Sequence, residues 1–180
     1  ATAIAANPAQ VAFSEGWNLA YTFSQVESGP TAGMGHGLFF SMPIYFGFAW
    51  GAGVELVRPD VENGSWRSPF TLNLAWRYAR LLSIGVSSRW FFSSVDPALS
   101  GLWAVDIGIS LRLGPYFAAA LTAHSINDPT AYGARLPSDL DRFGRQWSFG
   151  MVLRPTRQDT LSLAGEITYD GGLPIVSGFG

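Results

Sequence analysis

The chain has 180 residues, a formal net charge of −2 and no cysteine, and 13% of its residues are charged whereas 48% are hydrophobic. A soluble domain usually has about 25% charged residues, and a nucleic-acid-binding domain usually has a basic patch. The composition therefore argues against nucleic acid as a partner, and the lack of cysteine excludes disulfides and thiolate metal sites. No run of about 18 apolar residues occurs, so no transmembrane helix is expected.

The first half of the chain contains segments in which large apolar residues alternate with small or polar ones. The clearest runs from Phe70 to Ala79, where Phe, Leu, Leu, Trp and Tyr alternate with Thr, Asn, Ala, Arg and Ala. Segment 36–42 is weaker because Phe39 and Phe40 are adjacent. Successive side chains of a strand point to opposite faces of the sheet, so alternation is typical of strands. The pattern predicts strands at 17–24, 36–42, 46–56, 70–79 and 82–90.

The second half of the chain continues the pattern. From Trp103 to Leu113 every odd position is large and apolar, and the even positions are Ala, Asp, Gly, Ser and Arg. Segment 116–124 is weaker because it is rich in Ala. The pattern predicts further strands at 103–113, 116–124, 147–154 and 161–169. The chain is therefore expected to be all-β, with about nine strands in one antiparallel meander.

The connections between these segments alternate in length. Those near 43–45, 80–81, 114–115 and 155–159 are short, and those near 25–35, 58–68, 94–101 and 125–143 are longer and richer in Gly, Pro, Asp, Asn and Ser. Outer-membrane barrels have short periplasmic turns, longer outside loops and strands of about 10 residues with apolar side chains outward. This regularity predicts a transmembrane β-barrel in a bacterial outer membrane.

The predicted barrel has an odd number of strands. Residues 1–16 form an N-terminal periplasmic-side segment and residues 17–180 form the barrel, with no interdomain linker. A ninth strand would end outside, near Asp170, whereas bacterial single-chain barrels usually have even strand counts. We therefore expect an incomplete barrel, whose edges pair with further strands of the same polypeptide or with another chain. Gly171-Gly172-Leu173-Pro174 reads as the start of another long outside loop.

Eight ionisable residues fall on the side of the strands opposite the apolar side. A charge near the bilayer midplane on the lipid-facing side would cost about 2–4 kcal/mol, so these residues are expected to face the lumen. They form either a network that fills and rigidifies the interior, or a polar constriction along a solute path. The lumen-facing candidates are Glu55, Arg77, Arg89, Asp106, Arg112, His124, Arg154 and Glu166.

Aromatic residues gather near the predicted strand ends. Their rings combine an apolar body with a polar tip, which is typical of residues at membrane interfaces. A role in stacking on a ligand is the weaker alternative. These interface candidates are Trp17, Trp66, Trp90, Trp103, Tyr116, Trp147 and Tyr169.

No pattern of residues points to catalysis or metal binding. The two histidines, His36 and His124, are far apart in the sequence and have no HExxH spacing. His36 reads as a loop or strand-end residue. No G-x-S-x-G nucleophile elbow occurs. We therefore predict that the chain is not an enzyme and needs no metal or cofactor.

The first twelve residues carry a family resemblance. Their sequence is Ala-Thr-Ala-Ile-Ala-Ala-Asn-Pro-Ala-Gln-Val-Ala. It resembles a segment of the FadL-like and PorV-like outer-membrane barrels that reads approximately Asp-Ala-Thr-Ala, a few apolar residues, then Asn-Pro-Ala-Gly-Leu-Ala. Gln10 stands here where the family has Gly. The resemblance implies that Asn7 and Pro8 form a tight turn near the periplasmic end, just before the first strand.

A narrower resemblance covers most of the barrel region. Short motifs at 55–59, 101–108 and 153–155 look like a FadL-type barrel domain of myxobacterial proteins, some of which carry a signal-peptide-peptidase-type serine protease domain after the barrel. FadL-like proteins are associated with passage of hydrophobic compounds through the outer membrane. No ligand residue carries over, because no motif beyond the N-terminal segment matches position by position.

Three functions remain open from the sequence. The first is a FadL-like outer-membrane barrel of a Gram-negative bacterium that passes or binds a hydrophobic small molecule, with outer-membrane lipids as its surroundings. The second is a structural barrel that anchors a periplasmic domain or is one subunit of a surface complex. The third is a soluble β-sandwich or lipocalin-like binder.

Overall fold

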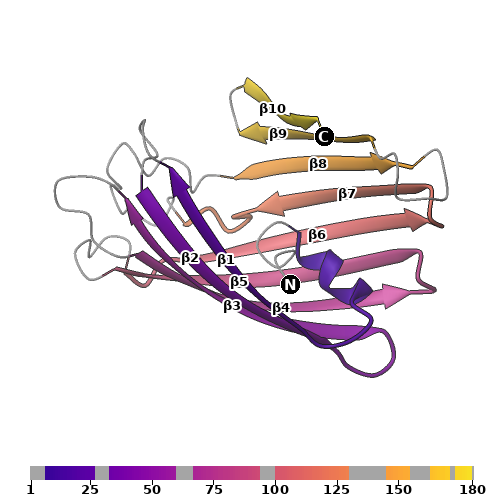
Figure 1. The fold of residues 1–180 in the computed structure, drawn as a ribbon, viewed down its shortest axis with the longest axis horizontal. Coiled ribbons are helices and arrows are strands. Elements are labelled where there is room, and N and C mark those ends of the chain that lie inside the picture. The colour runs from indigo at the N-terminus through magenta and orange to yellow at the C-terminus, as the bar shows by residue number, and fades with distance from the viewer. Residues whose placement is uncertain are drawn as a thin grey trace.

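The computed structural model describes residues 7–26, 33–59, 67–93, 100–129, 145–154, 163–170 and 173–179. The described residues form one short 3-10 helix and ten strands, which Figure 1 shows as a curved sheet with the helix against one face. The elements are η1 (Pro8–Phe13), β1 (Asn18–Val26), β2 (Gly33–Pro43), β3 (Phe48–Pro59), β4 (Arg67–Tyr78), β5 (Leu82–Ser93), β6 (Trp103–Leu113), β7 (Phe117–His124), β8 (Gln146–Leu153), β9 (Leu163–Asp170) and β10 (Leu173–Phe179).

The strands follow one another across the sheet in chain order, and each pairs with its neighbours in antiparallel fashion. The prediction of an all-β antiparallel meander is therefore confirmed. The nine predicted strands correspond to β1 through β9, and β6 has the predicted bounds. Within the described part of the chain the sheet is not closed, because β1 and β10 are its two edges. An open sheet of this kind is consistent with an incomplete barrel.

The C-terminal part differs from the expectation. Leu173 and Pro174, which were expected to begin a long loop, belong instead to β10, and Leu173 pairs with Asp170. Two glycines between alternating apolar segments are a hairpin pattern, and this pattern prevails here over the loop-forming tendency of Pro174. Residues 161 and 162, which the prediction included in the ninth strand, lie outside the described residues, and β9 is described from Leu163.

The two faces of the sheet have opposite compositions. On the outer face, large apolar side chains are open to the surroundings, with exposed fractions of 49% for Leu74, 42% for Ile109 and 44% for Phe149. On the inner face, which we define as the face that carries η1, small and polar side chains such as Asn73 and Ser110 are buried. A soluble protein buries large apolar residues and exposes polar ones, so this sheet has the reverse arrangement.

A small apolar cluster fixes η1 to the inner face. It consists of Val11 and Ala12 of η1 with Phe39, Ala49 and Ala75 of the sheet. The Phe39 ring lies over two glycines, since an added Cβ would come 2.6 Å from the ring at Gly37 and 2.5 Å at Gly53. Because these two glycines have no side chains, there is space for Phe39 on the inner face. The sequence alone did not show which of the adjacent residues Phe39 and Phe40 would turn inward.

The Asn-Pro-Ala segment forms the first turn of η1. The Asn7 side chain accepts a hydrogen bond from Ala9 N at 2.9 Å, which is a typical N-cap, and Pro8 occupies the first helical position. A Cβ on Gly85 would lie 2.5 Å from Ala9 N, and one on Gly108 would overlap Asn7 Oδ1. The resemblance implied a turn near the end of the strands. The structure places it over Gly85 and Gly108, in the interior of β5 and β6.

Candidate functional site

The predicted lumen-facing residues occupy strand positions on the inner face. Paired residues of neighbouring strands lie on the same face. Arg89 pairs with the buried Thr71, and Arg77 pairs with the buried Ser83. The register carries the other predicted residues to the same face, with Arg154 one position beyond the end of β8. They separate into two groups, one at each end of the strands.

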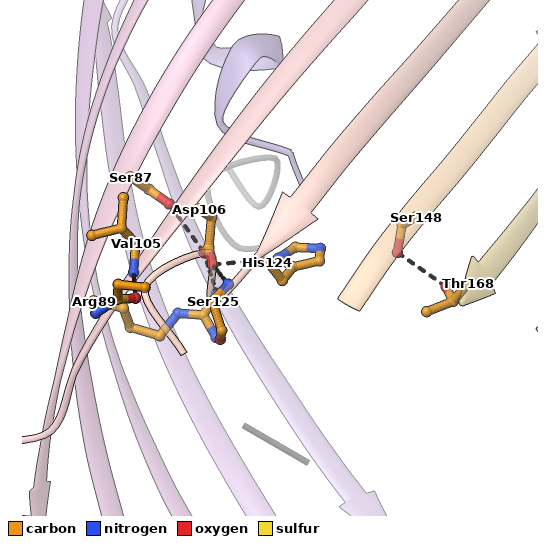
Figure 2. A network of polar contacts seen from close by, with 9 residues as sticks. Ser87, Arg89, Val105, Asp106, His124, Ser125, Ser148 and Thr168 are labelled. Carbon is orange, nitrogen blue, oxygen red and sulfur yellow. Dashed lines mark hydrogen bonds and ion pairs between the residues drawn. The ribbon is translucent and has the colours of Figure 1, made fainter. Parts of the chain in front are cut away.

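The first group surrounds Asp106, near the end of the sheet where the long connections lie (the loop end). Figure 2 shows Arg89, Ser87, Ser125 and His124 converging on this carboxylate. Asp106 is 1% exposed and its Oδ2 lies 2.5 Å from Arg89 Nη2, while Ser87 Oγ donates to the same oxygen at 3.1 Å. Ser125 N donates to Oδ1 at 2.9 Å, and His124 Nδ1 lies 3.6 Å from Oδ1. A buried carboxylate with a cation and two hydrogen-bond donors is well satisfied.

This network also holds the chain that follows β7. Asn127 Oδ1 accepts a hydrogen bond from Val105 N at 2.9 Å, and its Nδ2 donates to Trp103 O at 2.6 Å. Ile126 N donates to Val105 O at 2.9 Å. Segment 125–128 is therefore folded back along β6, and Asp106 fixes its first residue. The geometry favours the interpretation of this group as a rigid interior network rather than a free charge on a solute path.

The same contacts do not form a nucleophile–base pair. Ser87 and His124 contact different oxygens of Asp106, so the Ser87 hydroxyl donates to the carboxylate and not to an imidazole. Glu55 of β3 lies close enough to Arg89 for electrostatic attraction. The other histidine, His36, is in β2, and its Nδ1 lies 2.7 Å from Tyr21 Oη in a largely exposed pair.

The second group lies at the opposite end, where β4 and β6 enter short turns (the turn end). Arg77 of β4 and Arg154, after β8, are both close enough to Arg112 of β6 to repel its charge. The Arg112 guanidinium lies over the Phe13 ring, 4.0 Å from the ring centroid. Such a cation–π contact with η1 stabilises the positive charge of Arg112 but does not neutralise it. Among the described residues, an arginine thus contacts a carboxylate at the loop end, whereas three arginines lie near one another at the turn end.

A cavity of about 630 Å³ adjoins this second group. Arg112, Arg154 and Glu166 contribute charges to its lining, and Gln10 of η1 and Ser110 of β6 contribute polar groups. Small residues of β7, β8 and β9 also line it, which are Ala118, Ala119, Ala120, Gly150, Ala164 and Gly165. This volume lies within the usual range of small-molecule sites, roughly 300–1,000 Å³.

Several of these residues have no pattern in the sequence that marks them. Ser87, Ser125 and Asn127 complete the Asp106 network only because the strand register and the turn after β7 bring them there. Gln10 reaches the cavity and Phe13 reaches Arg112 because η1 lies along the inner face. Trp66, one of the interface candidates, lies outside the described residues.

Two further observations concern the described part of the chain. It contains no group of three or more His, Asp or Glu side chains that could hold a metal ion. None of its helical segments is long and apolar enough to cross a membrane.

The fold and the site define an all-β protein with one antiparallel meander sheet, an inner helix and an inner cavity. Comparison of the chain with family models, with curated proteins and with solved structures found no match.

Proposed function

We propose that this chain is the wall of a FadL-like β-barrel in a bacterial outer membrane, which passes or binds a small hydrophobic molecule and is not an enzyme. One observation carries the membrane assignment, namely the reversed composition of the two faces. The outer face exposes rows of Leu, Ile, Val, Phe and Trp, whereas the inner face buries Ser, Thr, Asn and Asp. Exposed apolar area of this extent is costly in water and favourable in lipid.

The outer face has the three bands that a bilayer favours. Exposed aromatic residues lie at the turn end and again at the loop end, with aliphatic residues between them. The turn-end residues are Trp17, Tyr45, Tyr78 and Tyr116, the loop-end residues are Trp103, Trp147 and Tyr169, and the middle residues include Leu74, Val86, Ile107, Ile109 and Leu121. Aromatic girdles at both interfaces are typical of transmembrane barrels.

The strand lengths support the same proposal. β3, β4 and β5 each have 12 residues. At a rise of about 3.3 Å per residue such a strand is roughly 40 Å long. A tilt of about 45° reduces its height to roughly 28 Å, close to the apolar band of about 25 Å in outer-membrane barrels.

A flotation experiment tests the membrane assignment. The purified chain is folded with phospholipid vesicles and centrifuged through a density gradient. We expect it to float with the vesicles after a high-salt and urea wash and to need detergent for solubility in their absence. A stable, detergent-free monomer that sediments apart from the vesicles would support the soluble β-sandwich or lipocalin-like alternative instead.

The structural-barrel alternative has an observation in its favour. η1 packs on the inner face over β3, β4, β5 and β6, so part of the interior is filled. The cavity beside β7, β8 and β9 favours ligand binding or passage.

Release of an entrapped hydrophobic dye from vesicles that contain the protein discriminates between passage and a structural role. Release faster than from protein-free vesicles supports passage, and no release in protein that has floated supports the anchor or subunit role.

A further inference from the structure

We propose that the outer face holds one anionic glycerophospholipid at the β4–β5 hairpin, with an acyl chain in an apolar groove and the phosphate at Arg80. The inference goes beyond the proposed function, because it names a lipid headgroup and a site for it. It rests on that function in one respect, namely that the outer face meets a bilayer. The groove, a tyrosine beside it and the arginine at the tip of the hairpin all lie within the described part of the chain.

The groove has a volume of about 430 Å³ and lies on the outer face, with residues of β3, β4, β5 and β6 in its lining. Its large side chains are Phe48, Leu74, Trp76, Ile84, Val86 and Ile107. The lining that the described residues form has no charged side chain, and the Trp76 indole N–H is its one polar side-chain group. Water in such a space would lack hydrogen-bond partners, so hydrocarbon is the occupant that fits it.

The groove lies at the depth of acyl chains in a bilayer. Tyr78, the next outer-face residue of β4 toward the turn end, is 62% exposed and belongs to the turn-end aromatic band. Trp76 and Leu74 lie roughly 7–13 Å from it along the strand, which a tilt of about 45° reduces to roughly 5–9 Å in height. One leaflet contributes about 15 Å to the hydrocarbon core. A lipid whose headgroup lies beside Tyr78 therefore reaches the groove with its acyl chain.

The tip of the same hairpin supplies a cation for the headgroup. Leu81 N donates a hydrogen bond to Tyr78 O at 3.0 Å, so Ala79 and Arg80 are the central residues of a two-residue turn. Arg80 is exposed, and the structure records no ion pair between it and another described residue. A guanidinium donates to two phosphate oxygens at once. The hairpin thus presents a groove, a tyrosine and a cation in the order in which a lipid presents its chain, glycerol and phosphate.

The backbone conformation at Arg80 supports a role for its side chain. Ala79 and Arg80 have φ values of 50° and 58°. Two-residue turns with positive φ favour Asn-Gly, because glycine adopts this conformation without steric cost. Strained positions of this kind occur where a side chain has a function. A contact with a lipid phosphate, which glycine cannot make, accounts for an arginine at this position.

The test measures which lipid lies beside the groove. The chain has no cysteine, so a single Ile109→Cys variant takes one nitrobenzoxadiazole label at a residue that pairs with Ile84 but does not line the groove. The full chain is folded into vesicles in which nitroxide-labelled phosphatidylcholine quenches the label and phosphatidylglycerol displaces the quencher. We expect phosphatidylglycerol to bind about fivefold more tightly, because one arginine attracts an anionic headgroup by about this factor. A label at Phe149→Cys, on the outer face of β8, should report no preference.

Two pairs of variants in the Ile109→Cys background assign the preference to the site. Arg80→Gln should abolish it, whereas Arg58→Gln removes the same charge at the loop end of β3 and should leave it unchanged. Leu74→Trp fills the groove and should also abolish the preference. Leu72→Trp adds the same bulk to the same face of β4, outside the groove lining, and should not. Equal affinities for the two lipids at Ile109 would overturn the inference, as would a folded Arg80→Gln or Leu74→Trp variant that keeps the preference.

The same preparations separate the lipid from other occupants. Inorganic phosphate at matched ionic strength should leave the preference unchanged, and a loss of preference would overturn the inference by assigning Arg80 to a free anion. Energy transfer between labelled copies that Leu74→Trp abolishes would also overturn it, because a second copy would then occupy the groove. Protein that floats with vesicles but shows no lipid preference contradicts the lipid site alone. Protein that does not float contradicts the membrane barrel.

Discussion

Gly108 lies directly beneath Asn7, so close that a Cβ at Gly108 would overlap the Asn7 Oδ1 atom that caps η1. The N-terminal segment and the interior of β6 therefore fit together only because residue 108 has no side chain. Asn73 of β4 adds a hydrogen bond from Nδ2 to Pro8 O at 3.2 Å. These contacts hold the helix against the middle of the sheet rather than at its edge.

Gly108→Ala should destabilise the protein by about 1–3 kcal/mol, the usual cost of inserting a methyl group into a filled site. The free energy of unfolding in lipid vesicles, measured by urea titration, checks this value. Gly165→Ala is the matched control, because a Cβ there meets nothing within 4 Å. Equal stabilities of the two variants would contradict the close fit of η1 on β6.

Asp106→Asn should destabilise the protein by about 1–3 kcal/mol, because it removes the negative charge that Arg89 faces and weakens the bonds from Ser87 and Ser125. Limited proteolysis should also cut more readily after β7, since Ser125 loses its anchor. Glu15→Gln removes a charge at an exposed position and should change stability by less than about 0.5 kcal/mol. Unchanged unfolding and proteolysis in Asp106→Asn would mean that the network is not needed to hold segment 125–128.

Ile109→Arg should destabilise the folded protein in vesicles by about 2–4 kcal/mol, because residue 109 lies mid-strand on the outer face, where the proposed bilayer is least polar. Leu113→Arg lies at the end of the same strand and the same face, and should cost only about 0–1 kcal/mol. Both values come from unfolding in vesicles. An equal cost at the two positions would show that depth in a bilayer does not govern the outer face.

Arg80→Gly should stabilise the protein by about 1 kcal/mol. Ala79 and Arg80 have φ values of 50° and 58° in the turn between β4 and β5, and non-glycine residues are strained in this left-handed region. Leu81→Gly is the control in the same turn, where the structure records no positive φ, and it should destabilise. Thermal or urea unfolding of the pair gives the sign of each effect, and a destabilised Arg80→Gly variant would contradict the strain.

The alternation of large apolar with small or polar side chains was enough to predict the sheet, because a period of two is typical of strands and it recurs in most segments of the chain. β6 has the predicted bounds, since large apolar residues occupy one of its faces and small or polar residues the other along the whole strand. β2 was less clear because Phe39 and Phe40 are adjacent, and the space over Gly37 and Gly53 decides which one turns inward. That space belongs to β2 and β3 together and cannot be predicted from either strand alone.

The inner face was predicted only in part. The charged residues were assigned to it by their positions in each strand, but whether they pair depends on the register between strands. The register brings Asp106 to Ser87 and leaves Arg112 opposite Ala118. The position of η1 against the inner face, which brings Gln10 to the cavity, is not predicted by any alternation in the sequence. Pro174 obscured β10, because proline is uncommon within strands.

The central claim, that the outer face meets lipid, is tested most directly by two adjacent residues of β8. Phe149 is 44% exposed on the outer face, and Ser148 lies on the inner face with its Oγ 3.0 Å from Thr168 Oγ1. Single Phe149→Cys and Ser148→Cys variants are labelled with bimane and folded into vesicles, and quenching by brominated lipid is compared with quenching by aqueous iodide. The account predicts that brominated lipid quenches the label at 149 and spares the label at 148. Strong iodide quenching at 149, with no effect of brominated lipid, would contradict the account.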